Sequence, residues 1–276
     1  MIPASFEYER AESADHALEL LSQHGDEAKL LAGGHSLLPM MRLRLATPSA
    51  LVDIGRLKDL SYVRDEGDTV AIGALTVHED LKNNDVLEQH CPIVSHTAGE
   101  IGDPQVRHLG TIGGSLAHGD PASDLPAVLL ALEAEFVVHS SSGDRTIAAG
   151  DFFTGIFETA LGPMDLLTEI RVQKTGSGGW SYQKFHHRAQ DWAVVGVAAV
   201  RRNGNTAVAL TNMGEFPMRA GAVESALSSG TDAASAANDV AQNTSPPSDP
   251  FGSAEYRREL AVVLCRRALE EAQSRL

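Results

Sequence analysis

The stretch that decides the fold is LLAGGHSLLPMM, from Leu30 to Met41. Its apolar residues lead into a Gly-Gly pair that is followed by a histidine and a serine. A glycine pair in such a place marks a tight turn or a point where the backbone comes close to a ligand. The residues AKLL just before it are expected to form a short buried strand. The pattern therefore predicts a strand that runs into a glycine turn, which is either structural or part of a binding site.

A second glycine element, GTIGGS from Gly110 to Ser115, is similar to the first. A hydroxyl side chain follows each Gly-Gly pair, directly at Ser115 and one residue later at Ser36. Consecutive backbone N–H groups in such turns bind anions, and a hydroxyl adds a further donor. The two elements together predict a diphosphate-binding site that needs neither a lysine side chain nor a metal ion. Neither has the Walker A pattern or the GxGxxG spacing of a Rossmann nucleotide site.

The polar residues after the second element have two readings. His118, Asp120, Ser123 and Asp124 precede the apolar run LPAVLLAL, which is expected to be a helix. Ser123 or Asp124 would cap that helix, with Pro126 in its first turn. Capping does not exclude ligand contact, because a helix N-terminus also attracts anions and hydroxyls. The residues alone thus predict a diphosphate-containing cofactor and leave its identity open.

Composition excludes several classes of function. The chain has 276 residues and a net charge of −15, which argues against a nucleic-acid binder. No apolar run approaches 18 residues and the N-terminus lacks a secretory pattern, so we expect a cytoplasmic protein without a membrane span. Cys91 and Cys265 are far apart and cannot by themselves build an iron–sulfur cluster or a zinc site. Since neither HExxH nor GxSxG occurs, we predict no metal ligands and no catalytic side chain.

The order of elements suggests two or three α+β units. Ser13 is expected to cap a helix that ends near Gly25, and VLEQHCPIVSHTAGEIG (86–102) reads as one helix. The glycine-rich segment QKTGSGGW, from Gln173 to Trp180, marks a boundary. Beyond it we expect a hairpin around Asn203-Gly204-Asn205, an exposed loop SPPSDPFGS and a final helix capped by Ser253.

Four segments together are similar to one known family: LLAGGHSLLPMMRLRLATPSALVDI, HLGTIGGSLAHGDPASDLPAVLLAL, NMGEFPMRA and SAEYRRELAVVLCRRALEEA. The chain resembles, from Phe6 to its last helix, the FAD-binding medium subunit of molybdenum hydroxylases of the carbon monoxide dehydrogenase and xanthine dehydrogenase kind. The resemblance implies an α+β flavoprotein. A two-subdomain FAD-binding domain (PCMH/vanillyl-alcohol-oxidase-like) would span residues 1–175, as subdomains 1–55 and 56–175. A smaller C-terminal α+β domain would span residues 179–276.

The resemblance also implies which residues contact FAD. The first glycine element would bind the diphosphate through its backbone and one hydroxyl, with the residues Ala32, Gly33, Gly34, His35, Ser36 and Leu37. The second would close on the diphosphate from the other side through Thr111, Gly113, Gly114 and Ser115. Ser115 stands where asparagine is commoner, and Gln173 stands where a proline is common; neither departure threatens FAD binding.

Further contacts are implied outside the glycine elements. His118 matches a cofactor contact, and Asp124 matches the acidic residue that holds FAD hydroxyls. Leu166 or Leu167 would lie at the isoalloxazine edge. The last implied contact is Lys184. Trp192, where relatives often have tyrosine, would pack near the ring.

In such complexes, a large subunit with a molybdenum cofactor oxidises the substrate and a small subunit with [2Fe–2S] clusters relays the electrons. FAD in the medium subunit passes them to an external acceptor, and a dimer of heterotrimers is the implied assembly. The first alternative is a stand-alone FAD-dependent oxidase or reductase acting on a small organic substrate, with His35 as the candidate for covalent flavin attachment. The others are an assembly subunit without flavin and a binder of another diphosphate metabolite.

Overall fold

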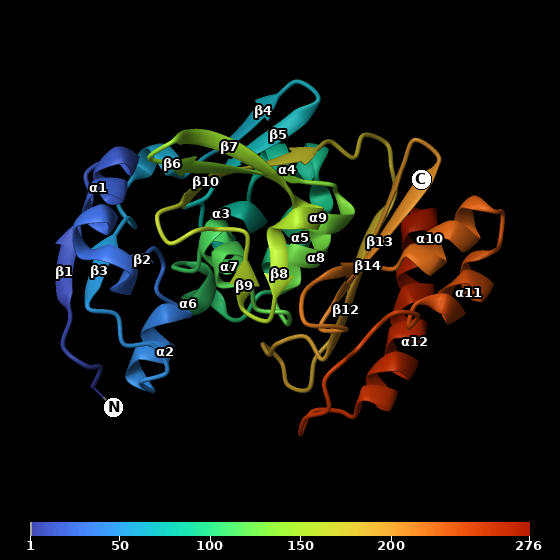
Figure 1. The fold of residues 1–276 in the computed structure, drawn as a ribbon. Coiled ribbons are helices and arrows are strands. Elements are labelled where there is room, and N and C mark those ends of the chain that lie inside the picture. Colours follow the sequence, from blue (N-terminus) through green and yellow to red (C-terminus); the bar gives the residue numbers. More distant parts are fainter. Residues whose placement is uncertain (1) are drawn as a thin grey trace.

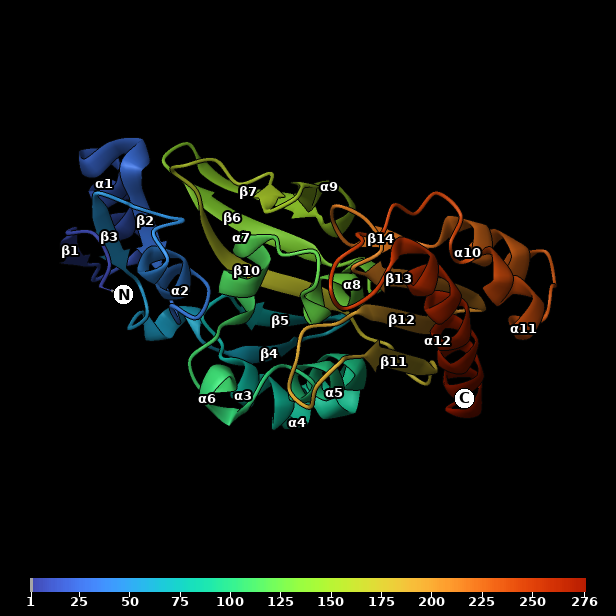
Figure 2. The same ribbon diagram turned by 90° about the horizontal axis from the view of Figure 1, so that it is seen from below.

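The computed structural model describes residues 2–276 and arranges them as three units in chain order (Figures 1 and 2). The first unit is a three-stranded parallel sheet of order β1-β3-β2, with β3 in the centre. Ser13 caps its first helix as predicted, because the Ser13 side chain accepts a hydrogen bond from the His16 N–H. The elements of this unit are β1 (Glu7–Arg10), α1 (Ala14–His24), η1 (Gly25–Glu27), β2 (Ala28–Leu31), α2 (Leu37–Arg42) and β3 (Ala50–Asp53).

The middle unit is a five-stranded antiparallel sheet of order β4-β5-β10-β6-β7. Helices α7 and α8 lie below β6 and β10 in Figure 1. The strands are β4 (Val63–Glu66), β5 (Thr69–Gly73), β6 (Glu135–Ser140), β7 (Gly143–Ala148) and β10 (Leu166–Gln173), with a separate pair β8 (Phe153–Gly155) and β9 (Glu158–Thr159). The helices are η2 (Lys58–Leu60), α3 (His78–Lys82), α4 (Asp85–His90), α5 (Pro92–Gly99), α6 (Pro104–Arg107), α7 (Ile112–His118), α8 (Asp124–Ala131) and α9 (Ala149–Phe152).

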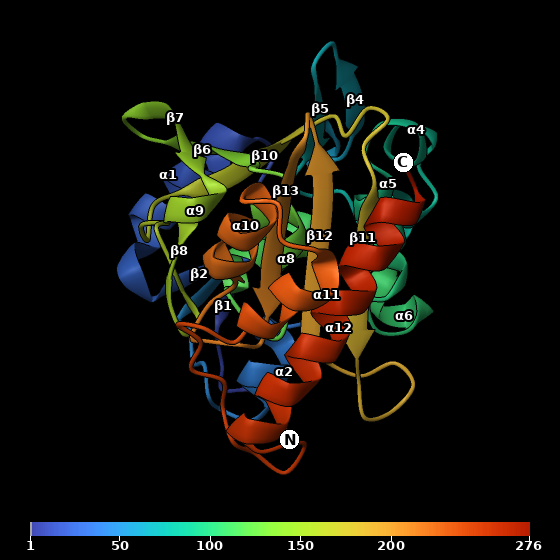
Figure 3. The same cartoon turned by 90° about the vertical axis from the view of Figure 1, so that its right-hand side faces the viewer.

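The last unit is a four-stranded antiparallel sheet of order β11-β12-β13-β14. In Figure 3 this sheet has α10 to α12 on its near side and α8 behind it. The elements are β11 (Trp180–Phe185), β12 (Val195–Arg202), β13 (Asn205–Thr211), β14 (Met218–Arg219), α10 (Gly221–Ser228), α11 (Ala233–Ala236), η3 (Ala237–Asp239) and α12 (Ala254–Ser274).

The two faces of strand β12 contribute side chains to two different hydrophobic cores. Side chains alternate across a strand, so neighbouring residues face opposite sides of the sheet. Val197 and Ala199 belong to the core that the sheet forms with α12. Ala198 and Val200 belong to the core of the middle unit, together with Tyr182 of β11. The last sheet is therefore covered on both faces, and its inner face joins it to the middle unit.

Most of the predicted elements are present, and two expectations are corrected. Residues 86–102 do not form one helix, because the chain breaks between α4 and α5 at Cys91, just before Pro92. Proline disfavours helical conformation at the preceding residue and is well placed at the start of the next helix. The second Gly-Gly pair is not an open turn, since Gly113 and Gly114 lie in the first turn of α7. The domain bounds at residues 55, 175 and 179 stay predictions.

Candidate cofactor site

The first glycine element is a short arch between β2, which ends at Leu31, and α2, which begins at Leu37. Gly34 has φ of 72°, a conformation that favours glycine. Among residues 2–276, no acceptor lies within hydrogen-bond distance of four consecutive backbone N–H groups, those of residues 33–36. The Ser36 hydroxyl likewise has no partner in that part of the chain. An arch with several unused donors is the arrangement that binds an anion such as a phosphate.

The second glycine element differs, because its N–H groups are used within the protein. The N–H of Gly113 donates to the Ala74 carbonyl at 2.8 Å, and that of Gly114 donates to Thr111 Oγ1 at 3.1 Å. The expectation of consecutive free amides is therefore wrong for this element. Gly113 instead permits close packing, since a Cβ there would lie 2.6 Å from the Ala74 Cβ. What faces outward from this turn is the half-buried Ser115, whose hydroxyl has no partner among the described residues.

The structure brings the two elements together. A Cβ built on Gly33 would lie only 1.8 Å from the carbonyl oxygen of Leu109, one residue before the second element. A Cβ on Gly114 would lie 4.0 Å from the Ala32 Cβ. The first arch and the start of α7 thus lie next to each other; their joint contact with a diphosphate stays a prediction.

The histidines near the two elements make different contacts. His35 is exposed, and its Nε2 lies 3.1 Å from the carbonyl oxygen of Gln105. His78 is buried, and burial beside the Arg107 guanidinium lowers its pKa to about 4. His118 packs its ring on Phe157 at 5.0 Å between centroids, and burial lowers its pKa. Contact of His35 and His118 with FAD stays a prediction.

Asp124 and Lys184, predicted from different parts of the chain, meet in the interior. Lys184 Nζ donates to Asp124 Oδ2 at 2.8 Å and to the carbonyl of Glu100 at 3.0 Å. The side chains of Lys184 and Asp124 are 3% and 6% exposed. Burial raises the pKa of Asp124, although the Lys184 charge and the hydrogen bonds oppose this rise. The pair links α8 to β11 and so joins the last two units.

Two predicted apolar contacts lie in different cores. Leu166 belongs to the core of the first unit and Leu167 to that of the middle unit, and both are buried. Trp192 is 58% exposed. It lines a cavity of about 250 Å³ between Asp120 of the middle unit and residues of the last unit, which include Phe251. The role of these three residues at the flavin ring stays a prediction.

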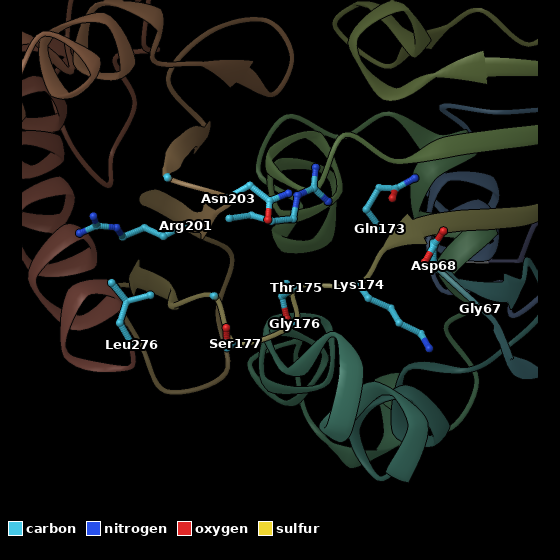
Figure 4. A pocket seen from close by; sticks show the side chains of 13 residues that line it. Gly67, Asp68, Gln173, Lys174, Thr175, Gly176, Ser177, Arg201, Asn203 and Leu276 are labelled. Carbon is cyan, nitrogen blue, oxygen red and sulfur yellow. The ribbon is translucent and has the colours of Figure 1, made fainter.

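A larger cavity, of about 750 Å³, lies away from the predicted contacts, between the β4–β5 turn, the linker 173–178 and the β12–β13 turn. Figure 4 shows that the side chains of Lys174 and Arg201 point in opposite directions. Lys174 is bound to Asp65 at 2.6 Å. Lys174 and Arg201 therefore do not converge on a common point.

Two residues that organise the site, Tyr182 and Arg107, are not indicated by any sequence motif. Tyr182 donates its hydroxyl to Asp124 Oδ1 at 2.7 Å. Arg107 bonds to Glu79 at 2.7 Å and to the carbonyl of Ile101 at 3.1 Å. Tyr182 stands two residues before Lys184, and the period of a strand would have placed the two side chains on one face. The residues next to Arg107 in the sequence do not indicate these contacts.

Comparisons with known proteins agree with this geometry. Residues 4–174 match the family model "FAD binding domain in molybdopterin dehydrogenase", and residues 180–272 match "CO dehydrogenase flavoprotein C-terminal domain". The chain belongs to the FAD-binding medium subunits of the molybdenum hydroxylases. It is 43% identical to the carbon monoxide dehydrogenase medium chain of Hydrogenophaga pseudoflava, over 100% of this chain and 99% of that protein.

Two further matches support the assignment. The glyceraldehyde dehydrogenase medium chain of Sulfolobus acidocaldarius is 40% identical, over 98% of this chain and 99% of that protein. A solved structure of carbon monoxide dehydrogenase from Hydrogenophaga pseudoflava superposes with a TM-score of 0.95 at 42% identity, covering 100% and 99% of the two chains. The α+β fold with an FAD-binding and a C-terminal flavoprotein domain is therefore confirmed, and so is the chain's place as an oxidoreductase flavoprotein subunit with FAD as cofactor.

The donor set fits FAD. A diphosphate carries two negative charges; the first arch offers four unused amides and the unused Ser36 hydroxyl, and the second element offers the Ser115 hydroxyl. Within residues 2–276, no group of three or more His, Cys, Asp or Glu side chains could hold a metal ion. Cys91 and Cys265 are free and buried. In the same part of the chain, no helix is both long and apolar enough to cross a membrane.

Proposed function

We propose that this medium subunit accepts electrons from the [2Fe–2S] clusters of a small partner subunit and passes them to an external acceptor. A large partner subunit with the molybdenum cofactor would oxidise the substrate. The observation that carries the proposal is the arch 33–36, whose free amides are placed against the start of α7. Bound FAD supplies the redox chemistry, and this chain supplies its position and electrostatic environment.

Several of the predicted residues have a physical task in this scheme. The amides of residues 33–36, with Ser36 and Ser115, would offset the diphosphate charge. Asp124 would accept from hydroxyl groups of FAD, and Lys184 would supply the counter-charge of the carboxylate. No side chain of this subunit is required as a general base. The predictions of a dimer of heterotrimers and of cytoplasmic localisation are kept as part of this proposal.

The test is to purify the chain with and without its partner subunits and to follow flavin reduction. We expect FAD to be reduced by the substrate of the complex only when the partners are present. Reduction of the isolated subunit by a small organic substrate would instead support the stand-alone oxidase or reductase. Denaturing the protein tests the same alternative, since a flavin bound covalently at His35 would stay attached. Because His35 Nε2 faces the Gln105 carbonyl, we expect the flavin to be released.

A further inference from the structure

The Asp124 carboxylate is held from two sides in the protein interior. Tyr182 donates to Oδ1 at 2.7 Å, and Lys184 donates to Oδ2 at 2.8 Å. Tyr182 is 4% exposed, and Lys184 and Asp124 are comparably buried. Burial and the neighbouring Asp124 charge raise the pKa of Tyr182 well above its ordinary value, so its hydroxyl keeps its proton and donates.

Strand β11 is built to deliver both donors to this carboxylate. Tyr182 and Lys184 are two residues apart, so they point to the same face of the sheet. Ser181 and Gln183 point the other way and bond to Glu271 of α12. Gly196 on the neighbouring strand leaves room for the phenol, since a Cβ there would lie 2.6 Å from the Tyr182 hydroxyl oxygen.

The residues Asp124, Tyr182 and Lys184 form a buried cluster, and the FAD-binding domain also holds the Lys184 side of it. Lys184 also bonds to the Glu100 carbonyl, which belongs to the turn after α5. Arg107 is 8% exposed and holds this turn through the Ile101 carbonyl, while Glu79 neutralises its charge. The cluster therefore has little freedom, and the orientation of Asp124 is set jointly by the two domains.

We propose that Tyr182 is a positioning residue for FAD, which acts by fixing Asp124 from the C-terminal domain; this rests on the proposed contact between Asp124 and FAD hydroxyls. A carboxylate oxygen that accepts one hydrogen bond keeps a second lone pair for another donor. Without the phenol, the carboxylate could rotate to place both oxygens on Lys184. FAD affinity is thus coupled to the docking of β11 on α8.

The experiment compares Tyr182→Phe with the wild-type chain, since this change removes the hydroxyl and keeps the ring. The readouts are the dissociation constant of FAD, from quenching of flavin fluorescence, and the melting temperatures with and without FAD. If the carboxylate rotates and loses its hydrogen bond to an FAD hydroxyl, we expect FAD to bind about tenfold or more weakly. Tyr62→Phe is the matched control, because it removes a similar tyrosine–carboxylate bond, to Glu169, and should leave FAD binding unchanged.

A double-mutant cycle separates positioning from a general structural effect. If Tyr182 acts through Asp124, Tyr182→Phe should have no further effect on FAD binding in an Asp124→Ala background, which has no oxygen for Tyr182 to orient. The inference would be overturned if Tyr182→Phe binds FAD with unchanged affinity and its melting temperature falls by the same amount with and without FAD. If that variant does not fold, Tyr182→Met, which also removes the hydroxyl and fills the space with a flexible apolar side chain, is held to the same outcomes. Failure of the wild-type chain to bind FAD would overturn the proposed contact and this inference with it.

Discussion

Gly33 lies so close to Leu109 that a Cβ on the glycine would meet the leucine carbonyl oxygen at 1.8 Å. The two residues are 76 positions apart in the chain, so this contact holds the two glycine elements together. The first glycine pair therefore has two tasks: Gly34 adopts a positive φ, and Gly33 permits backbone to pack on backbone. The positive φ of Gly34 and the close packing at Gly33 together give the arch the shape that leaves its backbone N–H groups free.

Gly33→Ala is expected to separate the two elements. The obstacle is a backbone carbonyl, which cannot move aside like the end of a flexible side chain, and overpacking of this kind costs about 1–3 kcal/mol. We expect a lower melting temperature and loss of bound FAD, measured by calorimetry and by the flavin absorbance of the purified protein. Gly150→Ala is the control, because nothing lies within 4 Å of a Cβ there. Normal FAD content in Gly33→Ala would contradict this account.

The two serines test whether both elements reach the diphosphate. Ser36→Ala and Ser115→Ala each remove one hydroxyl that has no partner among residues 2–276. A hydrogen bond to a charged group is worth roughly 1.5–3 kcal/mol. Each variant should therefore bind FAD about tenfold or more weakly in a fluorescence titration, with the melting temperature without FAD unchanged. If Ser115→Ala binds FAD normally, the second element only supports the first arch.

Asp124→Ala is expected to weaken FAD retention and to destabilise the protein. Without the carboxylate, the Lys184 ammonium, which is 3% exposed, stays buried without its counter-charge. Breaking a buried pair in this way costs about 3–5 kcal/mol, whereas replacing both partners costs less. The double variant Asp124→Ala/Lys184→Met should therefore regain stability in denaturant unfolding but not FAD binding. Recovery of FAD binding in the double variant would show that Asp124 does not contact the cofactor.

Local patterns in the sequence were sufficient to predict elements whose causes are local. The cap at Ser13, the hairpin turn at Asn203-Gly204 and the cap at Ser253 follow from side chains next to the affected backbone. The break at Cys91 also has a local cause in Pro92, but the apolar periodicity concealed it. The family and its cofactor came from the resemblance, because a Gly-Gly pair alone does not name a ligand.

The interior of the site could not be predicted, because its contacts are long-range. Asp124 and Lys184 are 60 residues apart, and no pattern shows that they form a buried pair. The role of Gly113 depends on its packing against Ala74, a residue of another segment. Two similar glycine motifs thus have different tasks, one offering free amides and the other close packing, and this difference appears only when the chain is folded.

His139 should make stability depend on pH at the junction of the first two units. Its Nε2 lies 2.8 Å from Asp15 of α1, and its Nδ1 lies 2.6 Å from Asp144, beside the β6–β7 turn. The hydrogen bonds to Asp144 and Asp15 raise the pKa of His139. A raised pKa means that the folded state holds the proton more tightly, so the stabilisation is complete below the unfolded pKa of about 6.5 and is lost as pH rises through the folded value.

His139→Gln should therefore lower the melting temperature most near pH 6, and its difference from the wild-type chain should shrink toward pH 9. Both carboxylates are largely exposed, which limits each pair to about 0.2–1 kcal/mol and makes the effect weaker at high salt. His187→Gln is the control, since His187 is exposed and packs on Phe251 in the last unit. A difference that does not vary between pH 6 and 9 would show that His139 contributes by packing alone.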